Sequence, residues 1–259
     1  MPRNSDRRHQ TRRKKKNRKR NRNHDLELDQ DQNNHRGNKW GGIPHILPKT
    51  PGQNEYLRTL RRHDVVFGLG PAGTGKTFLA VAEAVTALQK GHVRKVILTR
   101  PAVEAGERLG FLPGRAQDKV APYLQPLLES LNKLLTRNRV ENDIRNGIIE
   151  IAPLAFMRGR TLEDAYVLLD EAQNCTFDQL KMLLTRLGEG SRCIITGDAS
   201  QVDLDPRDSG LRAMIKALEK VGGVKVYELT PDDVVRHPLV AQIIKAVAEY
   251  EKKPLRKAG

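Results

Sequence analysis

Eight consecutive residues carry the clearest chemistry in this sequence. They fit the spacing Gly-x-x-x-x-Gly-Lys-Thr and are Gly70, Pro71, Ala72, Gly73, Thr74, Gly75, Lys76 and Thr77. Glycines let a loop turn so that several backbone N–H groups face one anion, and the helix that follows adds its positive N-terminal end. The spacing therefore predicts a phosphate-binding loop, in which Lys76 reaches the β- and γ-phosphates of a nucleotide and Thr77 ligates Mg²⁺.

A pair of acidic residues forms the second chemical signal. Asp170 and Glu171 directly follow the apolar run 166–169. An aspartate at the tip of a strand can hold Mg²⁺, and the adjacent glutamate can orient and deprotonate the water that attacks a γ-phosphate. Such a pair can instead cap the next helix. Because it occurs together with Lys76 and Thr77, we interpret it as part of a nucleotide-hydrolysing site.

Short apolar runs and helical patterns alternate from residue 65 onward, and these elements must position the two motifs. We expect strands at 65–69, 95–99, 148–152, 166–169, 192–196 and 225–229, and helices at 76–90, 118–138, 176–187, 210–220 and 238–252. This alternation is typical of an α/β fold, a three-layer arrangement in which a mostly parallel sheet has helices on both faces. The apolar stripe of helix 118–138 is interpreted as core packing, and Pro122 and Pro126 are expected to break or delay its first turns.

Most of the positive charge lies at the N-terminal end. Residues 1–24 contain twelve Lys and Arg and one acid, so they hold +11 of the formal net charge of +15 on the 259-residue chain. Such a segment has too few apolar residues to fold. We therefore expect a disordered basic tail and linker at 1–40 and a single domain at 41–259. The tail favours binding to RNA or another polyanion; a solubility tail or a nuclear-localisation-like sequence are the alternatives.

The apolar segments and the cysteines narrow the cellular setting. No apolar run approaches the roughly 20 residues that cross a bilayer, and no signal-peptide core follows the basic start. The two cysteines, Cys175 and Cys193, occur without a C-x-x-C motif or a cluster of histidines, so the sequence suggests neither a disulfide framework nor a zinc site. Cys193 is interpreted as a small buried residue. We expect a cytoplasmic protein with no membrane contact.

Further polar residues resemble helicase motifs. Residues 170–173 read Asp-Glu-Ala-Gln, which is similar to helicase motif II. Residues 197–201 read Gly-Asp-Ala-Ser-Gln and resemble motif III, where the glutamine, here Gln201, senses the γ-phosphate; an ordinary loop residue is the alternative. Gln53 resembles the glutamine that reads adenine and so selects ATP. Gln53 also lies in the first turn of an expected short helix, with Thr50 as its cap.

Seven segments together carry a family resemblance. They are 70–77, 99–107, 109–114, 156–161, 170–174, 197–198 and 233–238. In combination they resemble the PhoH-like family of bacterial P-loop ATPases, which is named for induction by phosphate starvation. The resemblance implies a RecA-like P-loop NTPase domain of the helicase type that binds and hydrolyses ATP with Mg²⁺ and acts in RNA metabolism.

The resemblance also raises the question of a second lobe. Helicases of the resembled class bind ATP between two lobes, and the second lobe contributes an arginine; this sequence predicts one lobe. The arginine must then come from this lobe or from another subunit. A ring satisfies this need, so we expect a homo-oligomeric ring, with a hexamer favoured by the resemblance, in which a neighbour completes the site. Arg236 is the first candidate for this arginine and Arg160 and Arg158 are the next. A salt bridge from Arg236 to Asp232 or Asp233 is the alternative.

The predicted function is an ATPase that remodels or unwinds RNA. Three residues at the end of an expected β-strand, Thr99, Arg100 and Pro101, occupy the place where helicases contact the backbone of single-stranded nucleic acid. Arg115 and Lys119 extend that surface. The alternative is an ATP-dependent switch or scaffold that recruits a nuclease or the ribosome without translocating. A small-molecule kinase shares the phosphate-binding loop, but the helicase-like motifs disfavour it.

Overall fold

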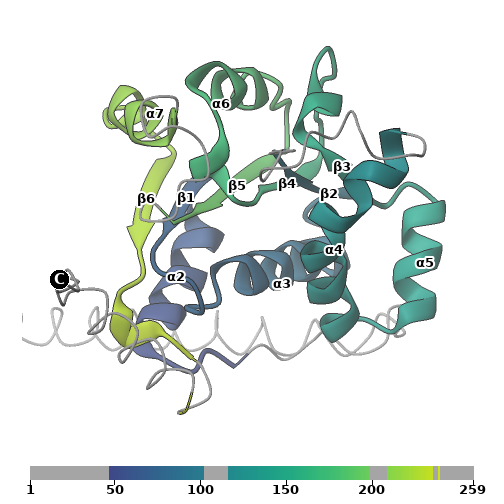
Figure 1. The fold of residues 1–259 in the computed structure, drawn as a ribbon, viewed down its shortest axis with the longest axis horizontal. Coiled ribbons are helices and arrows are strands. Elements are labelled where there is room, and N and C mark those ends of the chain that lie inside the picture. Colours follow the sequence, from purple (N-terminus) through teal and green to yellow (C-terminus); the bar gives the residue numbers. More distant parts are fainter. Residues whose placement is uncertain (1–46, 102–115, 199–208, 236–238, 240–259) are drawn as a thin grey trace, which may run out of the picture. The chain divides into compact units, whose positions relative to one another are not determined.

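Six parallel strands form the centre of the fold (Figure 1). The structure, a computed structural model, describes residues 47–101, 116–198, 209–235 and 239. The strands are β1 (Val65–Leu69), β2 (Lys95–Arg100), β3 (Ile149–Pro153), β4 (Ala165–Leu169), β5 (Arg192–Gly197) and β6 (Val224–Glu228), and their order in the sheet is β3-β2-β4-β5-β1-β6. Each strand matches its predicted range to within one residue at either end. The four inner strands are short, mostly apolar runs, whereas the edge strands β3 and β6 also contain charged residues, Glu150 in β3 and Lys225 and Glu228 in β6.

Helices cover both faces of this sheet, as predicted (Figure 1). On one face lie α2 (Pro51–Arg62), α3 (Lys76–Gln89) and α4 (Ala116–Leu134), and on the other lie α6 (Phe177–Leu184) and α7 (Leu211–Leu218). Alternate strand residues point to opposite faces, so Val66 and Val96 belong to the first core cluster and Phe67 and Ile97 to the second. Short 3₁₀ helices are η3 (Leu154–Met157), η4 (Ala172–Asn174) and η5 (Pro231–Asp233). The chain therefore has the predicted three-layer α/β fold.

The predicted helix 118–138 differs from the observed elements. Helix α4 runs from Ala116 to Leu134 with Pro122 and Pro126 inside it, so the expected break at these prolines is wrong. A proline already has the helical φ, and the wholly buried Leu127 and Leu131 hold the helix against the sheet, which confirms the core interpretation. A second helix, α5 (Arg137–Arg145), follows an extended Thr136 (φ −67°, ψ 147°) and was not predicted.

Helix α6 ends three residues earlier than predicted. The backbone N–H of Leu162 donates to the carbonyl of Arg186 (2.8 Å), and the N–H of Gly188 donates to the carbonyl of Leu162 (2.7 Å). These bonds pull residues 186–188 out of the helix and into a bridge with residue 162. The predicted helix 238–252, the tail 1–40 and the boundary at residue 41 lie outside the described residues.

Two smaller expectations can be compared with the structure. Cys175 and Cys193 are free and buried, and burial raises the pKa of each thiol to about 12. Both therefore behave as small apolar core residues, as predicted for Cys193. Within the described ranges, no helix is both long enough and apolar enough to cross a bilayer.

The strand order determines which loops meet. Leu69 at the end of β1 is level with Gly197 of β5, while Leu169 of β4 is level with Ile195 of β5 and Thr99 of β2. All these strands run in the same direction, so the residues that follow them gather at one edge of the sheet. Carboxyl-terminal strand edges are the usual ligand site of open α/β sheets. The phosphate-binding loop and Asp170 lie at this edge.

Candidate functional site

The glycine-rich loop has the backbone conformation that its sequence predicts. Gly70 has φ +135°, and a Cβ there would lie 2.4 Å from the carbonyl oxygen of Leu229, so only glycine fits. Gly75 (φ +82°) is the N-cap of helix α3. The Lys76 ammonium crosses the loop and donates to the carbonyls of Gly70 (2.6 Å) and Pro71 (2.8 Å). The loop therefore presents a lysine and a helix N-terminus to the same small space, as a phosphate site requires.

A hydroxyl and a carboxylate meet beside this loop. The Thr77 hydroxyl donates to Oδ1 of Asp170 (2.6 Å), and the Thr196 hydroxyl donates to the same oxygen (2.7 Å). Strand β5 lies between β1 and β4, which explains why Thr196, at the middle strand, reaches Asp170. Sequence reasoning missed Thr196, although it directly precedes the Gly-Asp pair of the predicted motif III.

These oxygens fit the Mg²⁺ that the sequence predicts. Mg²⁺ prefers oxygen ligands, and it commonly binds through one or two carboxylates together with substrate phosphates. In the part of the chain that the structure describes, no group of three or more His, Cys, Asp or Glu could hold a metal ion. Thr77 and Asp170 are the residues of this chain that would hold Mg²⁺, with phosphate oxygens as further ligands.

Glu171 has an unusual backbone conformation. Its φ of 58° and ψ of 41° lie in the left-handed region, which costs a non-glycine residue about 1 kcal/mol or more. Its side chain accepts a hydrogen bond from the amide of Gln173, whose own oxygen accepts from the backbone N–H of Asp198 (3.0 Å). Glu171 makes no side-chain cap bond to η4. This geometry disfavours the helix-cap alternative and fits the predicted catalytic role.

Arg100 lies in the same site. The sequence placed it on a surface for nucleic acid, but its side chain is only 16% exposed. Its guanidinium contacts Oδ2 of Asp170 (3.2 Å) and Oε1 of Glu171 (2.7 Å), and it donates to the carbonyl of Tyr123 (2.9 Å). No motif in the sequence predicted this contact, because it depends on β2 and β4 being neighbours.

Gln53 supports the loop from the side of helix α2. Its amide donates to the carbonyl of Thr74 (3.0 Å) and accepts from the backbone N–H of Lys49 (2.7 Å). Thr50 caps the helix by accepting from the N–H of Gln53 (3.1 Å), as expected. The reading of adenine by Gln53 stays a prediction, and Gln201 and Arg236 lie outside the described residues.

The other two candidate arginines, Arg158 and Arg160, lie just after η3. Arg160 pairs with both carboxylate oxygens of Glu150 (2.5 and 2.8 Å), and this pairing lowers the pKa of that carboxyl. Arg158 is exposed. Neither residue lines the cavity that contains the phosphate-binding loop.

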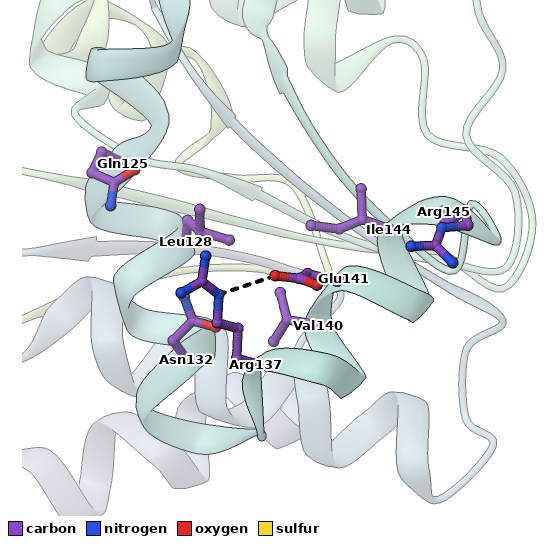
Figure 2. A pocket seen from close by; sticks show the side chains of 8 residues that line it. All are labelled: Gln125, Leu128, Asn132, Arg137, Val140, Glu141, Ile144 and Arg145. Atoms are coloured by element: carbon purple, nitrogen blue, oxygen red, sulfur yellow. Dashed lines mark hydrogen bonds and ion pairs between the residues drawn. The ribbon is translucent and has the colours of Figure 1, made fainter.

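Two cavities border helix α4. One of about 300 Å³ is lined by the phosphate-binding loop, the first turn of α3 and the ends of β2, β4 and β5, together with Pro126 and Ser130 of α4. A larger cavity of about 660 Å³ lies between α4 and α5 and contains the Arg137–Glu141 ion pair (Figure 2). The larger one has no glycine loop and no paired carboxylates, so we assign the chemistry to the smaller cavity.

The fold and this site define the chain as a protein of the P-loop NTPase fold, of the three-layer α/β type. A glycine loop, its lysine, a threonine–aspartate pair and an adjacent glutamate all meet at one sheet edge. The chain belongs to the family described as PhoH-like protein, whose family model matches residues 45–248.

Individual relatives agree with this assignment. The chain is 59% identical over 210 residues to a PhoH-like protein of Bacillus subtilis, covering 80% of this chain and 65% of that protein. It is 42% identical over 205 residues to Protein PhoH of Escherichia coli K12, covering 78% of this chain and 58% of that protein. The chain thus spans less than two thirds of the length of these curated relatives.

A solved structure is similar at a lower level. The Sulfolobus solfataricus SWI2/SNF2 ATPase core in complex with dsDNA is 16% identical and matches 80% of this chain and 53% of that chain, with a TM-score of 0.45. A likeness at this level adds nothing to the function.

Proposed function

We propose that this protein binds ATP with Mg²⁺, hydrolyses it, and uses the reaction to remodel or unwind RNA. One observation carries the hydrolytic part of the proposal. The hydroxyl of Thr77 and the carboxylate of Asp170 are 2.6 Å apart, and Glu171 lines the same cavity as the phosphate-binding loop. A phosphate cradle, a site for Mg²⁺ and a general base are the parts that hydrolysis of a nucleoside triphosphate needs.

Each residue has a distinct role in the proposed reaction. Lys76 exchanges the loop carbonyls that it now contacts for phosphate oxygens, which are stronger partners because they are charged. Thr77 and Asp170 hold Mg²⁺, which offsets negative charge on the phosphates when it is bound. Glu171 accepts a proton from the attacking water, a contribution of about 10²- to 10⁴-fold to rate for a well-placed general base.

The RNA part of the proposal has separate support. Residues 1–24 hold a net charge of +11, and such segments bind polyanions by releasing counterions. The resemblance to helicase motifs also supports RNA as the polyanion on which the ATPase acts. A homo-oligomeric ring in the cytoplasm, with a nuclease or ribosome as further partner, completes the proposal.

The test is the ATPase rate of the full chain with and without single-stranded RNA. We expect Mg²⁺-dependent turnover that RNA raises several-fold, and a parallel strand-displacement assay should detect unwinding. Deletion of residues 1–40 should weaken the stimulation and make RNA affinity less dependent on salt, because about 0.7 counterion is released for each phosphate contact to a single strand. Lys76→Ala serves as the inactive control.

Two outcomes would change the proposal. Turnover that is indifferent to RNA at both low and high salt contradicts action on RNA. Slow turnover without strand displacement, combined with ATP-dependent capture of a nuclease or ribosomes, would favour the alternative function, an ATP-dependent switch that does not translocate on RNA.

A further inference from the structure

Arg100 directs its guanidinium into the nucleotide cavity. It is the last residue of β2, and three polar groups hold it there: the carboxylates of Asp170 (3.2 Å) and Glu171 (2.7 Å) and the backbone carbonyl of Tyr123 (2.9 Å). With 16% of its side chain exposed, Arg100 has little contact with solvent. The guanidinium therefore belongs to the wall of the site rather than to the outer surface.

The carbonyl that accepts from Arg100 belongs to Tyr123 of helix α4, which directly follows Pro122. The same helix contributes Pro126 and Ser130 to the cavity wall. The prolines that looked like helix breakers thus lie where α4 meets the nucleotide site and Arg100.

The partners of Arg100 are the two groups that the proposed reaction needs. Binding of Mg²⁺ at Asp170 places a competing cation beside Arg100, while binding of a triphosphate brings an anion with oxygens spaced for the guanidinium fork. For Glu171 to act as a base, its carboxylate must also exchange the arginine for a water molecule. Both changes move the charge of Arg100 from the carboxylates towards phosphate.

We propose that Arg100 is the arginine that stabilises the transferring γ-phosphate, and that it acts within its own chain. This inference rests on the ATPase activity proposed above. As the water oxygen bonds to the γ-phosphorus and the bond to the β,γ-bridging oxygen breaks, Glu171 takes the water proton. Arg100 stays protonated throughout and donates to oxygens on which negative charge is greatest. The products are ADP and inorganic phosphate.

This assignment changes the expected source of the catalytic arginine. The arginine was expected from this lobe or, by preference, from a neighbouring copy, with Arg236 as first candidate. Arg160 is paired with Glu150, and among the residues that the structure describes Arg100 is the arginine lining the cavity. An arginine within the chain lets the site be complete before any ring forms.

The first test compares Arg100→Ala and Arg100→Lys with wild type, with Arg94→Ala as matched control. Arg94 directly precedes the same strand at the opposite edge of the sheet, and its side chain is 88% exposed. Arg100→Ala should lower kcat by at least about 10²-fold, in the direction of the 10³- to 10⁵-fold effect of arginine fingers. Arg100→Lys should recover only part, because lysine lacks the fork. Arg94→Ala should match wild type.

A binding measurement separates catalysis from folding. Wild type and Arg94→Ala should bind ADP with aluminium fluoride, a mimic of the transferring phosphate, more tightly than a non-hydrolysable ATP analogue. Arg100→Ala should bind the ATP analogue within about tenfold of wild type but lose the preference for the mimic. An unchanged preference, or an ATP-analogue affinity lost together with the thermal transition, overturns the assignment.

Mixed oligomers decide between the same chain and a neighbour. If Arg100 acts in its own chain, mixing Arg100→Ala with Lys76→Ala chains leaves the activity at the sum of the two separate samples. Activity well above that sum would assign the arginine to a neighbour and contradict the inference. Hydrolysis absent from wild type would overturn the proposed function and this inference together, whereas hydrolysis unaffected by Arg100→Ala would overturn this inference alone.

Discussion

At the scale of single residues, the site depends on the side chains that hold the carboxylate of Asp170 in place. Asp170 receives two hydroxyl bonds on Oδ1, from Thr77 and Thr196, and an arginine on Oδ2. The sequence predicted Thr77 and Asp170 from their motifs. It did not predict Thr196 or Arg100, because their contacts with Asp170 cross between strands whose order no local pattern encodes.

Thr196→Val should weaken the use of Mg²⁺. Valine has nearly the shape of threonine but cannot donate to Asp170, and loss of a partner that orients a metal ligand typically costs 10- to 100-fold in metal affinity. We expect the Mg²⁺ concentration for half-maximal binding of a fluorescent ATP analogue to rise by about tenfold or more.

The control for this prediction is Thr86→Val. Thr86 is also buried, and its hydroxyl donates to the carbonyl of Ala82 within α3 (2.8 Å), away from the carboxylates. Both variants should lose similar stability. An equal Mg²⁺ dependence for the two variants would show that Thr196 only fills space.

At the scale of elements, two segments far from the phosphate-binding loop in sequence hold it. Gln53 of α2 donates to the carbonyl of Thr74, and the N–H of Val235, after η5, donates to the carbonyl of Gly73 (3.0 Å). Asp233 of η5 links these segments, because its carboxylate accepts from the Thr50 hydroxyl (2.5 Å) at the cap of α2. The sequence predicted the cap but not the link, which joins residues 183 positions apart.

Asp233 should make stability depend on pH in the acid range. The Thr50 hydroxyl, together with bonds from Thr230, lowers the pKa of Asp233 below its ordinary value. A lowered pKa means that the stabilisation is fully present above the unfolded value of about 3.9 and is lost as the pH falls through the folded value. Wild type should therefore exceed Asp233→Asn in stability at pH 6, and the difference should shrink below about pH 4.

Chemical denaturation of both proteins at a series of pH values measures this difference. Asp232→Asn is the control, because Asp232 is an exposed neighbour in the same η5 turn. A gap between wild type and Asp233→Asn that stays constant down to pH 3 would rule out the carboxylate as its source.

Helices and strands could be predicted where an apolar face or a short apolar run is enough to determine the element. The four inner strands could be read from their apolar runs because strands buried on both faces are nearly continuous in apolar residues. The end of α6 could not be read from the sequence, because it depends on the bridge between residues 162 and 187. The separate helix α5 could not be read either, because it depends on the extended backbone of Thr136. Tertiary contacts outweigh local propensity in both places.

At the scale of the whole molecule, the sheet brings together residues from widely separated parts of the sequence. Thr77, Arg100, Asp170 and Thr196 come from four segments, and the order β2-β4-β5-β1 places them at one edge. The motifs predicted that such a site exists. The residues that line the site, however, depend on the order of the strands in the sheet. The same order places Arg100 beside the carboxylates of Asp170 and Glu171.

Phosphate release by wild type and by Glu171→Gln shows whether this edge of the sheet hydrolyses ATP with Glu171 as the base. Wild type should release phosphate in the presence of Mg²⁺. Glu171→Gln should bind a non-hydrolysable ATP analogue within a few-fold of wild type while its turnover falls by at least about 10²-fold, since glutamine cannot accept the proton. No release by wild type, or equal turnover by Glu171→Gln, would contradict the account.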